Sequence, residues 1–261
     1  MKIRIRLNES KNKQELYDLE KSYFGGDPRD TAESLKFLVD NNKGEFGDID
    51  TYAIDQILKD AGETKVSYAG EGAFRITYSY GNDLVIKIAK TNTAKVMNEQ
   101  DTELGRNTKY ALLFPKVYMV DEPEYSWIVM EKCEPITDPD IFINFFPNDF
   151  YKNLSGFTAV RVFQILLDYE ANSIMKEETN LYDLRDTLKY YSKVTLTDED
   201  VKGILKEFNK TFHILADMVA EYRINPQEIR SYNTGIAPDG RFVVIDSSIA
   251  SAISKGLQSV P

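Results

Sequence analysis

The spacing of apolar residues divides the chain into a helical beginning, a strand-rich middle and a mostly helical remainder. Apolar side chains recur every three or four positions after Asp30 and again after Asp50, which predicts a helix beginning near each. Residues 66–90 are rich in valine, isoleucine, tyrosine and threonine and are interrupted by glycines, as is typical of strands joined by tight turns. A polar helix over 95–110 and two strands, over 114–120 and 125–130, are expected next.

From about residue 140 to 223 the pattern is mostly helical. The clearest helix begins after Thr197, a favourable N-cap residue, and its apolar face is continuous: Val201, Ile204, Leu205, Phe208, Phe212, Leu215, Val219 and Tyr222. A turn at 238–240 and a strand over 242–245 follow. We therefore divide the chain into an N-terminal helical accessory segment (1–63), a sheet-bearing segment (64–133) and a helical segment (134–261).

Composition narrows the class of protein. The 261 residues are 42% hydrophobic and 28% charged, as in ordinary soluble domains, and the net charge of −10 disfavours binding to nucleic acid. One cysteine and one histidine exclude an internal disulfide and a cysteine zinc cluster. No apolar run is long enough to span a bilayer and the N-terminus has no apolar signal core, so we expect no membrane partner and a cytoplasmic location.

Two features in the strand-rich segment are candidates for phosphate binding. Gly70 and Gly72 lie at a predicted turn between strands, where glycines allow backbone N–H groups to approach a phosphate, although an ordinary hairpin would also contain them. Lys87 lies in the middle of an apolar strand, where a charge needs a partner unless the strand is at an edge. Glu99 and Glu103 are one helical turn apart in the following helix, and either carboxylate is a candidate partner.

A second pair of candidates lies near the C-terminus. Asn233 and Asp246 are separated by a predicted hairpin, which would bring an amide oxygen and a carboxylate together at the strand ends. Oxygen ligands of this kind suit Mg²⁺ held together with substrate phosphates. Taken alone, the same residues fit a loop asparagine and a cap or turn aspartate somewhat better than a metal site.

In their order and spacing, these residues resemble the protein-kinase-like superfamily, and most closely the small kinase-like proteins encoded by bacteriophages. The resemblance covers roughly residues 64–250. It implies an α+β, two-lobed fold: a small N-terminal lobe with a five-stranded antiparallel sheet and one helix, and a helical C-terminal lobe truncated after the strand that leads to Asp246.

The resemblance also implies roles for individual residues. Gly70 and Gly72 match the glycine-rich loop, and Lys87 matches the strand lysine that contacts the nucleotide phosphates and is paired by Glu99 or Glu103. Adenine would bind at the connector between the lobes, which contains a gatekeeper residue and two hinge residues: Met130, Glu131 and Cys133.

The C-terminal matches are less regular. Asn233 and Asp246 match the two metal ligands, while Glu228 stands where the catalytic aspartate is expected and Arg230 where a lysine is usual. Asp246 is followed by two serines instead of phenylalanine and glycine, and the sequence stops soon afterwards. Ordinary docking of a peptide substrate is therefore in doubt.

We therefore expect a phosphotransferase dependent on ATP and Mg²⁺, acting on a protein serine or threonine or on a small molecule. Glu228 would orient or deprotonate the acceptor hydroxyl, and Arg230 would offset charge on the transferred group. The alternative is a pseudokinase that binds nucleotide or a partner protein without catalysis, and transfer of AMP is a further possibility on this fold. If the chain is viral, its location would be the host cytoplasm.

Overall fold

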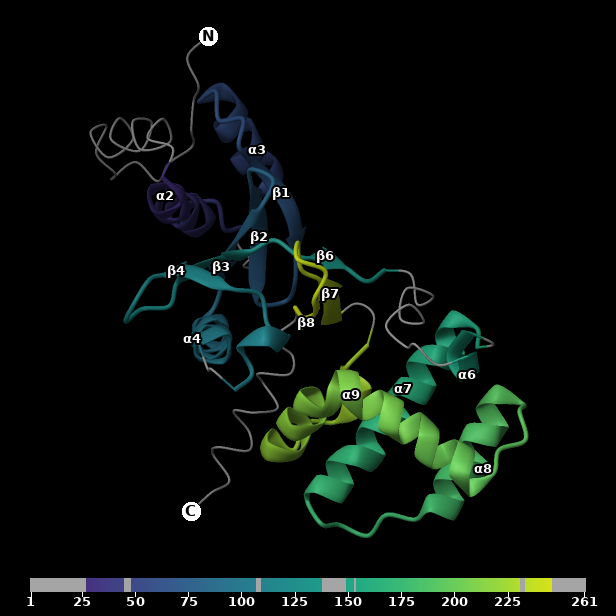
Figure 1. The fold of residues 1–261 in the computed structure, drawn as a ribbon. Coiled ribbons are helices and arrows are strands. Elements are labelled where there is room, and N and C mark those ends of the chain that lie inside the picture. Colours follow the sequence, from purple (N-terminus) through teal and green to yellow (C-terminus); the bar gives the residue numbers. More distant parts are fainter. Residues whose placement is uncertain are drawn as a thin grey trace. The chain divides into compact units, whose positions relative to one another are not determined.

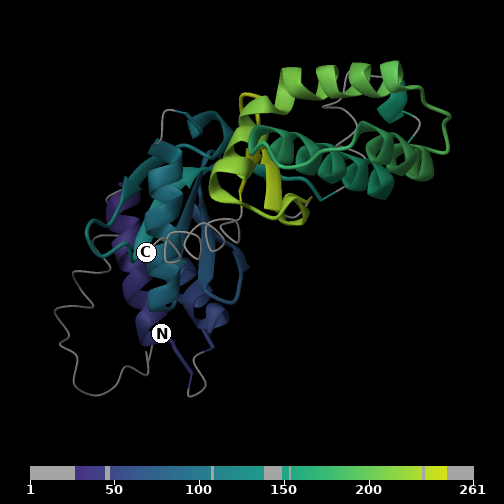
Figure 2. The same cartoon turned by 90° about the horizontal axis from the view of Figure 1, so that it is seen from below.

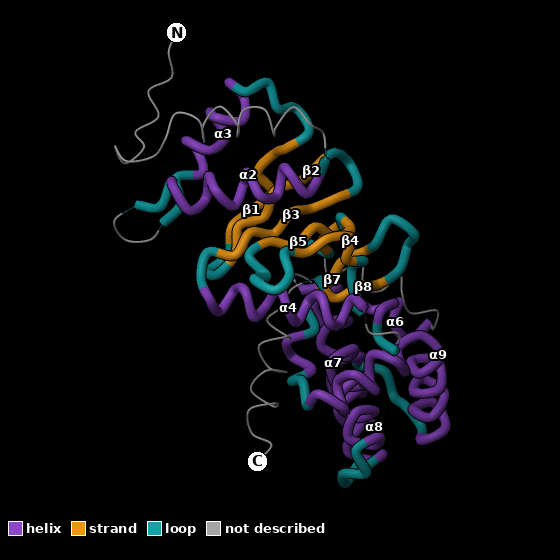
Figure 3. The backbone as a smooth tube through the Cα atoms, turned by 90° about the vertical axis from the view of Figure 1, so that its left-hand side faces the viewer, coloured by secondary structure: helices purple, strands orange, loops and turns teal. Residues whose placement is uncertain are grey.

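The strand-rich middle of the sequence forms one antiparallel sheet. The computed structural model describes residues 27–44, 48–106, 109–137, 149–152, 154–230 and 233–245, which form two units. The first unit contains the described residues up to Thr102 together with Lys116–Lys132. Its strands are β1 (Val66–Glu71), β2 (Arg75–Tyr80), β3 (Leu84–Ala89), β4 (Val117–Val120) and β5 (Trp127–Glu131) (Figure 1). They are hydrogen-bonded in the order β1-β2-β3-β5-β4, and β5 is labelled in Figure 3.

Alternation along the strands determines which side chains face each side of this sheet. Helices α2 (Pro28–Asn41) and α3 (Thr51–Asp60) contribute apolar residues that pack against every second strand residue, including Ile86 and Ile88. Lys87, between these two isoleucines, therefore points to the other face. Helix α4 (Asn92–Arg106) lies on the side of the sheet opposite α2 (Figure 1, Figure 3).

The second unit is built from helices around its own core. It contains Glu103–Pro115 and the described residues from Cys133 onward. Its helical elements are η1 (Ala111–Leu113), α6 (Asp149–Lys152), α7 (Gly156–Ile174), α8 (Leu181–Ser192), α9 (Asp198–Tyr222) and η2 (Pro226–Glu228). The long helices, green in Figure 2, pack side by side. Four phenylalanine rings meet in their core: Phe163, Phe208, Phe212 and Phe242.

A small three-stranded sheet joins this helical core. Its order is β6-β7-β8, comprising β6 (Glu134–Pro135), β7 (Thr234–Ile236) and β8 (Phe242–Val244). The turn between β7 and β8 uses Gly240 at φ 84°, a conformation that glycine adopts without steric cost. At Gly235 a Cβ would lie 2.8 Å from the backbone oxygen of Glu134, so close pairing with β6 requires glycine there.

The predicted fold class is confirmed. The chain is α+β, and its five-stranded sheet, with α4 between β3 and β4, has the arrangement expected of a protein-kinase-like small lobe. The predicted N-cap Thr197 is also confirmed, and it forms a capping box with Asp200. One helix start was wrong: α2 is capped by Asp27, whose carboxylate accepts from the N–H of Arg29, because Pro28 favours the first helical position.

None of the described helices combines the length and the apolar character needed to cross a membrane.

Candidate functional site

The two candidate glycines lie at the turn between β1 and β2. Gly70 is paired with Thr77, and the N–H of Gly72 donates to the carbonyl of Arg75 at 2.9 Å. A Cβ at Gly70 would meet no atom within 4 Å, and one at Gly72 would meet only that carbonyl oxygen, at 3.9 Å. Neither glycine has a left-handed backbone. Packing among the described residues thus does not require glycine at either position, which favours the prediction that the glycines leave room for a ligand.

Lys87 belongs to a buried polar group that we call the Asp101 cluster (Arg75, Lys87, Asn98 and Asp101). The Nζ of Lys87 lies 3.6 Å from Oδ2 of Asp101, and the Nη1 of Arg75 lies 2.6 Å from the same oxygen. Nη1 of Arg75 also donates to Oδ1 of Asn98 at 3.3 Å. The side chains of Arg75, Lys87 and Asp101 are each about one-tenth exposed, so the charges interact with little screening by solvent.

The expected partner of Lys87 is corrected by this geometry. The carboxylate beside Lys87 is that of Asp101, not that of Glu99 or Glu103. Glu103 is exposed and Glu99 is only half-buried, whereas Asp101 lies on the buried face of α4 with Met97 and Leu104. The two glutamates do share a face, but a residue two positions away points to the opposite side of a helix. The helical spacing of the apolar residues would have identified Asp101.

The sequence patterns predicted no role for Arg75. It stands where a third glycine of the loop is expected, and its guanidinium turns toward α4 to pair with Asp101. Asn98, one helical turn before Asp101, donates from Nδ2 to the carbonyl of Tyr125 at 2.9 Å. Arg75 and Asn98 therefore tie α4 to the sheet on the same face as Lys87.

The connector residues Met130, Glu131 and Cys133 come at and after the end of β5. Met130 is 3% exposed and pairs with Val85 in the sheet. The carboxylate of Glu131 accepts from the N–H of Lys116 at 3.2 Å, so its side chain interacts within the sheet. Cys133 is half-buried. The role of these residues in adenine binding stays a prediction.

Glu228 and Asn233 are joined by a hydrogen bond from a side chain to the backbone in the second unit. Glu228 ends η2, which is capped by Asn225, and its side chain is half-buried. Asn233 is 4% exposed, and its Nδ2 donates to the backbone oxygen of Glu228 at 2.8 Å. This bond fixes which end of the amide is oxygen. Arg230 is exposed.

The hairpin that was predicted to follow Asn233 is present. Thr234 pairs with Val244, and the N–H of Ile245 donates to the carbonyl of Asn233 at 2.9 Å. Asp246, the next residue, lies outside the described residues, so its role as a metal ligand stays a prediction. Within the described part of the chain, no group of three histidine, cysteine, aspartate or glutamate side chains is placed to hold a metal ion.

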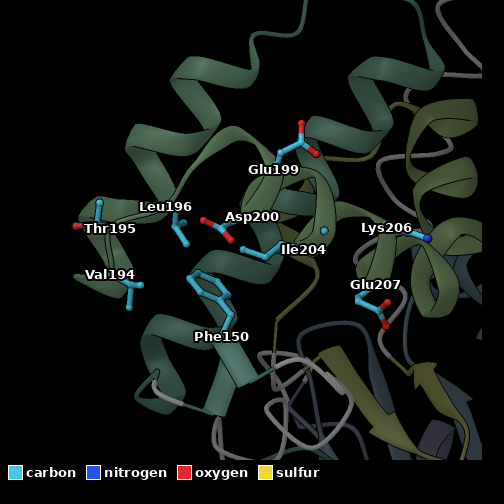
Figure 4. Close-up of a pocket in the computed structure, with 10 residues that line it drawn as sticks. Phe150, Val194, Thr195, Leu196, Glu199, Asp200, Ile204, Lys206 and Glu207 are labelled. Carbon is cyan, nitrogen blue, oxygen red and sulfur yellow. The ribbon is translucent and has the colours of Figure 1, made fainter.

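A cavity of about 540 Å³ lies in the second unit beside the start of α9 (Figure 4). Phe150, Leu196 and Ile204 contribute apolar surface, while Asp200 is occupied by its hydrogen bonds with Thr197. None of the described candidate residues lines this cavity. We therefore do not include it in the candidate site.

Several solved structures are similar to this chain. The streptomycin–ATP–APH(2")-IIa ternary complex is 15% identical, with 77% of this chain and 71% of that chain covered and a TM-score of 0.33. The gentamicin–APH(2")-IIa complex is 14% identical, with 77% and 70% covered and a TM-score of 0.34. ADP-bound aminoglycoside phosphotransferase APH(2'')-Ib is 15% identical, with 76% and 70% covered and a TM-score of 0.31.

With TM-scores this low, the likeness is partial and identifies neither an activity nor an acceptor for this chain. No protein-family model matches the sequence, and no curated protein matches it.

Proposed function

We propose that this chain is a phosphotransferase that uses ATP and Mg²⁺ and transfers the terminal phosphoryl group to a hydroxyl of a small molecule or a protein. The observation that supports this most directly is the Asp101 cluster. It holds the ammonium group of Lys87 beside a buried carboxylate, on the sheet face that α2 and α3 leave uncovered. A lysine held in this way is suited to contact nucleotide phosphates.

The glycine turn supports the same proposal. Gly70 and Gly72 belong to β1 and the turn after it, and β2 pairs with both β1 and β3, the strand that contains Lys87. Open space at the Cβ positions of both glycines allows a phosphate to approach backbone N–H groups there. Lys87 would then contact the α- and β-phosphates.

Asn233 and Asp246 would hold the metal ion. The oxygen end of the Asn233 amide is defined by the hydrogen bond from its Nδ2 to Glu228, and amide and carboxylate oxygens are the ligands that Mg²⁺ prefers. When bound, Mg²⁺ would neutralise charge on the phosphates. Glu228 would orient the acceptor hydroxyl and accept its proton, and Arg230 would lie within reach of developing negative charge.

A second candidate function is nucleotide binding without transfer. It is favoured by one feature, the glutamate at position 228, where the kinase-like pattern has the shorter aspartate. The two functions are separated by whether bound ATP is converted. Release of ADP and a phosphorylated acceptor supports transfer, release of pyrophosphate with an AMP-modified acceptor indicates nucleotidyl transfer, and stable binding without conversion supports the second candidate.

The test combines binding with product analysis on the full chain. We expect ATP with Mg²⁺ to raise the melting temperature, because a ligand at a hundredfold excess over Kd adds about 2.7 kcal/mol to the stability of the native state. Lys87→Ala should reduce this shift. The matched control is Lys95→Ala, since Lys95 pairs with Glu124 outside the Asp101 cluster and should leave the shift unchanged. A wild-type chain that shows no shift with any nucleotide would rule out both functions.

A further inference from the structure

Four consecutive backbone carbonyls around Glu228 accept hydrogen bonds from side chains. We call residues 226–230 the Glu228 segment. The carbonyl of Glu228 accepts from Asn233, and that of Arg230 accepts from the hydroxyl of Thr234 at 3.0 Å. The carbonyls on either side of Glu228, those of Gln227 and Ile229, both accept from the side chain of Gln164. Side chains thus hold these four carbonyls, in addition to the backbone bonds of the short helix η2.

Gln164 reaches this segment from the middle of α7. Its side-chain amide is largely buried, the residue being 9% exposed. Nε2 lies 3.3 Å from the oxygen of Gln227 and 3.1 Å from that of Ile229. A primary amide nitrogen has two hydrogens, so one Gln164 side chain can serve both acceptors.

The position of these bonds constrains Glu228 in particular. The peptide plane before Glu228 contains the carbonyl of Gln227, which Gln164 holds, and the plane after it contains the carbonyl of Glu228, which Asn233 holds. The second bond from Gln164 holds the carbonyl of Ile229, one plane further along. Fixing the planes on both sides of a residue restricts its backbone dihedrals, and these determine the direction of its Cα–Cβ bond. Ile229, the next residue, is fully buried in the helical core, which prevents the segment from rotating as a whole. The Glu228 carboxylate, in contrast, accepts no hydrogen bond from the described residues and extends from a fixed backbone.

We propose that Gln164 is a positioning residue for Glu228: its amide holds the two flanking carbonyls so that the carboxylate is directed at the acceptor hydroxyl. The proposal rests on the proposed function, because it assigns Glu228 the role of proton acceptor. Gln164 does not touch the reacting atoms. Its contribution is orientation, and a displacement of about 1 Å at a reacting group can cost about 10²-fold in rate.

The first measurement uses Gln164→Met, which keeps the length of the side chain and removes the donor. We expect kcat for ATP turnover to fall by up to about 10²-fold while KM for ATP stays nearly constant. A second variant, Gln164→Glu, is used if the methionine variant folds poorly. It keeps the shape of the side chain but places an acceptor against the two carbonyls, and we expect the same fall in kcat. The control is Asn209→Leu, which deletes an amide from α9 whose oxygen has no hydrogen-bond partner among the described residues; kcat should not change.

The second measurement separates positioning from a general structural role. Gln164→Met is combined with Glu228→Gln in a double-mutant cycle. If Gln164 acts through Glu228, its loss should have little further effect once the carboxylate is gone. Equal fold losses of kcat in both backgrounds would overturn the proposal.

Failure of the proposed function is recognised separately, by hydrogen exchange. The N–H group of Glu228 donates to the carbonyl of Asn225, just before the segment, and that of Ile229 donates to the carbonyl of Pro226. They should exchange faster in Gln164→Met than in the wild type, and they should be unaffected in Asn209→Leu. Unchanged exchange would refute the positioning role even in an active protein. A wild type without turnover but with faster exchange in the variant would refute the proposed function while supporting the role of Gln164 in holding the segment.

Discussion

In the sheet, Lys87 is held beside a charged partner, whereas in the second unit Glu228 is held by hydrogen bonds between neutral groups. The Asp101 cluster contains two cations and a carboxylate, each about one-tenth exposed. The Glu228 segment depends on amide and hydroxyl donors that bond to backbone oxygens. Removing one member of a buried ion pair costs about 3–5 kcal/mol, while one neutral hydrogen bond contributes about 1 kcal/mol. Variants of the cluster should therefore lose stability, and variants of the segment should mainly lose activity.

The largest effect should come from removing the helices that cover the sheet. Deletion of residues 1–63 would expose the apolar sheet face, because Leu35, Leu38, Ile54 and Leu58 pack against it. Truncating a single buried leucine or isoleucine to alanine costs about 2–5 kcal/mol, so losing four such residues exceeds the stability of a typical domain. We expect aggregation or a large fall in melting temperature. A soluble, well-folded shortened chain would instead indicate a separate N-terminal domain.

Asp101→Ala tests the contribution of the Asp101 cluster to stability. It leaves Arg75 and Lys87 without the carboxylate between them, and we expect the free energy of unfolding in urea to fall by about 3–5 kcal/mol. Glu103→Ala, on the exposed face of the same helix, should change it by less than about 0.5 kcal/mol. Equal effects of the two substitutions would mean that the cluster does not stabilise the sheet.

Glu228→Gln tests the Glu228 segment, which is held by hydrogen bonds between neutral groups. If Glu228 accepts the proton of the acceptor, its loss should lower the transfer rate by roughly 10²–10⁴-fold, with ATP affinity nearly intact and little change in melting temperature. Glu199→Gln, an exposed acid at the start of α9, is the control. An active wild type with an equally active Glu228→Gln variant would remove this residue from the mechanism.

Asp246→Asn should separate the metal from the nucleotide. We expect it to abolish the additional stabilisation that Mg²⁺ gives to ATP binding while some metal-free binding remains, because it removes the carboxylate that would hold the ion. Lys87→Ala should instead reduce the thermal shift with and without metal, because Lys87 would contact phosphate directly. Identical responses of the two variants to Mg²⁺ would show that Asp246 is not a ligand.

The smallest effect is expected at the exposed ion pair of the second unit. Hydrogen bonds from Lys109 and Tyr110 hold the pKa of Glu221 below its ordinary value. A lowered pKa means that this contribution to stability is present above the ordinary pKa of about 4.3 and is lost as the pH falls through the lowered value. Glu221→Gln should therefore lower the melting temperature slightly at neutral pH and not at low pH. A difference that persists in acid would show another cause.

Much of the fold could be predicted because its determinants are local. Alternation in β2 and β3, the turn at Gly81 and the cap at Thr197 each act over a few residues. The predicted start of α2 at Asp30 was wrong for a local reason as well, since Asp30 lies inside the first turn and the Asp-Pro step before it begins the helix.

The candidate residues were only partly predictable. Lys87 and Asn233 were candidates because of their order and surroundings, and Glu228 because of the resemblance; their functional roles stay predictions, and their partners depend on which helix faces are buried. Asp101 could have been found from the apolar spacing of α4. No pattern could have linked Gln164 to Gln227 and Ile229, because that contact joins residues far apart in sequence through the packing of α7.

The pairing of Arg75 with Asp101 also determines how often α4 can leave the sheet. A movement that separates the two side chains while one of them stays buried leaves an uncompensated buried charge, which costs about 3–5 kcal/mol. Each 1.4 kcal/mol is a factor of ten in population, so fewer than about one molecule in a hundred would have α4 displaced. A partner that switched the protein off by moving this helix would have to bind the displaced state at least about 10²-fold more tightly than the docked one. In this chain, the helix beside Lys87 is therefore a fixed part of the sheet unit and not a switch that is already balanced between two positions.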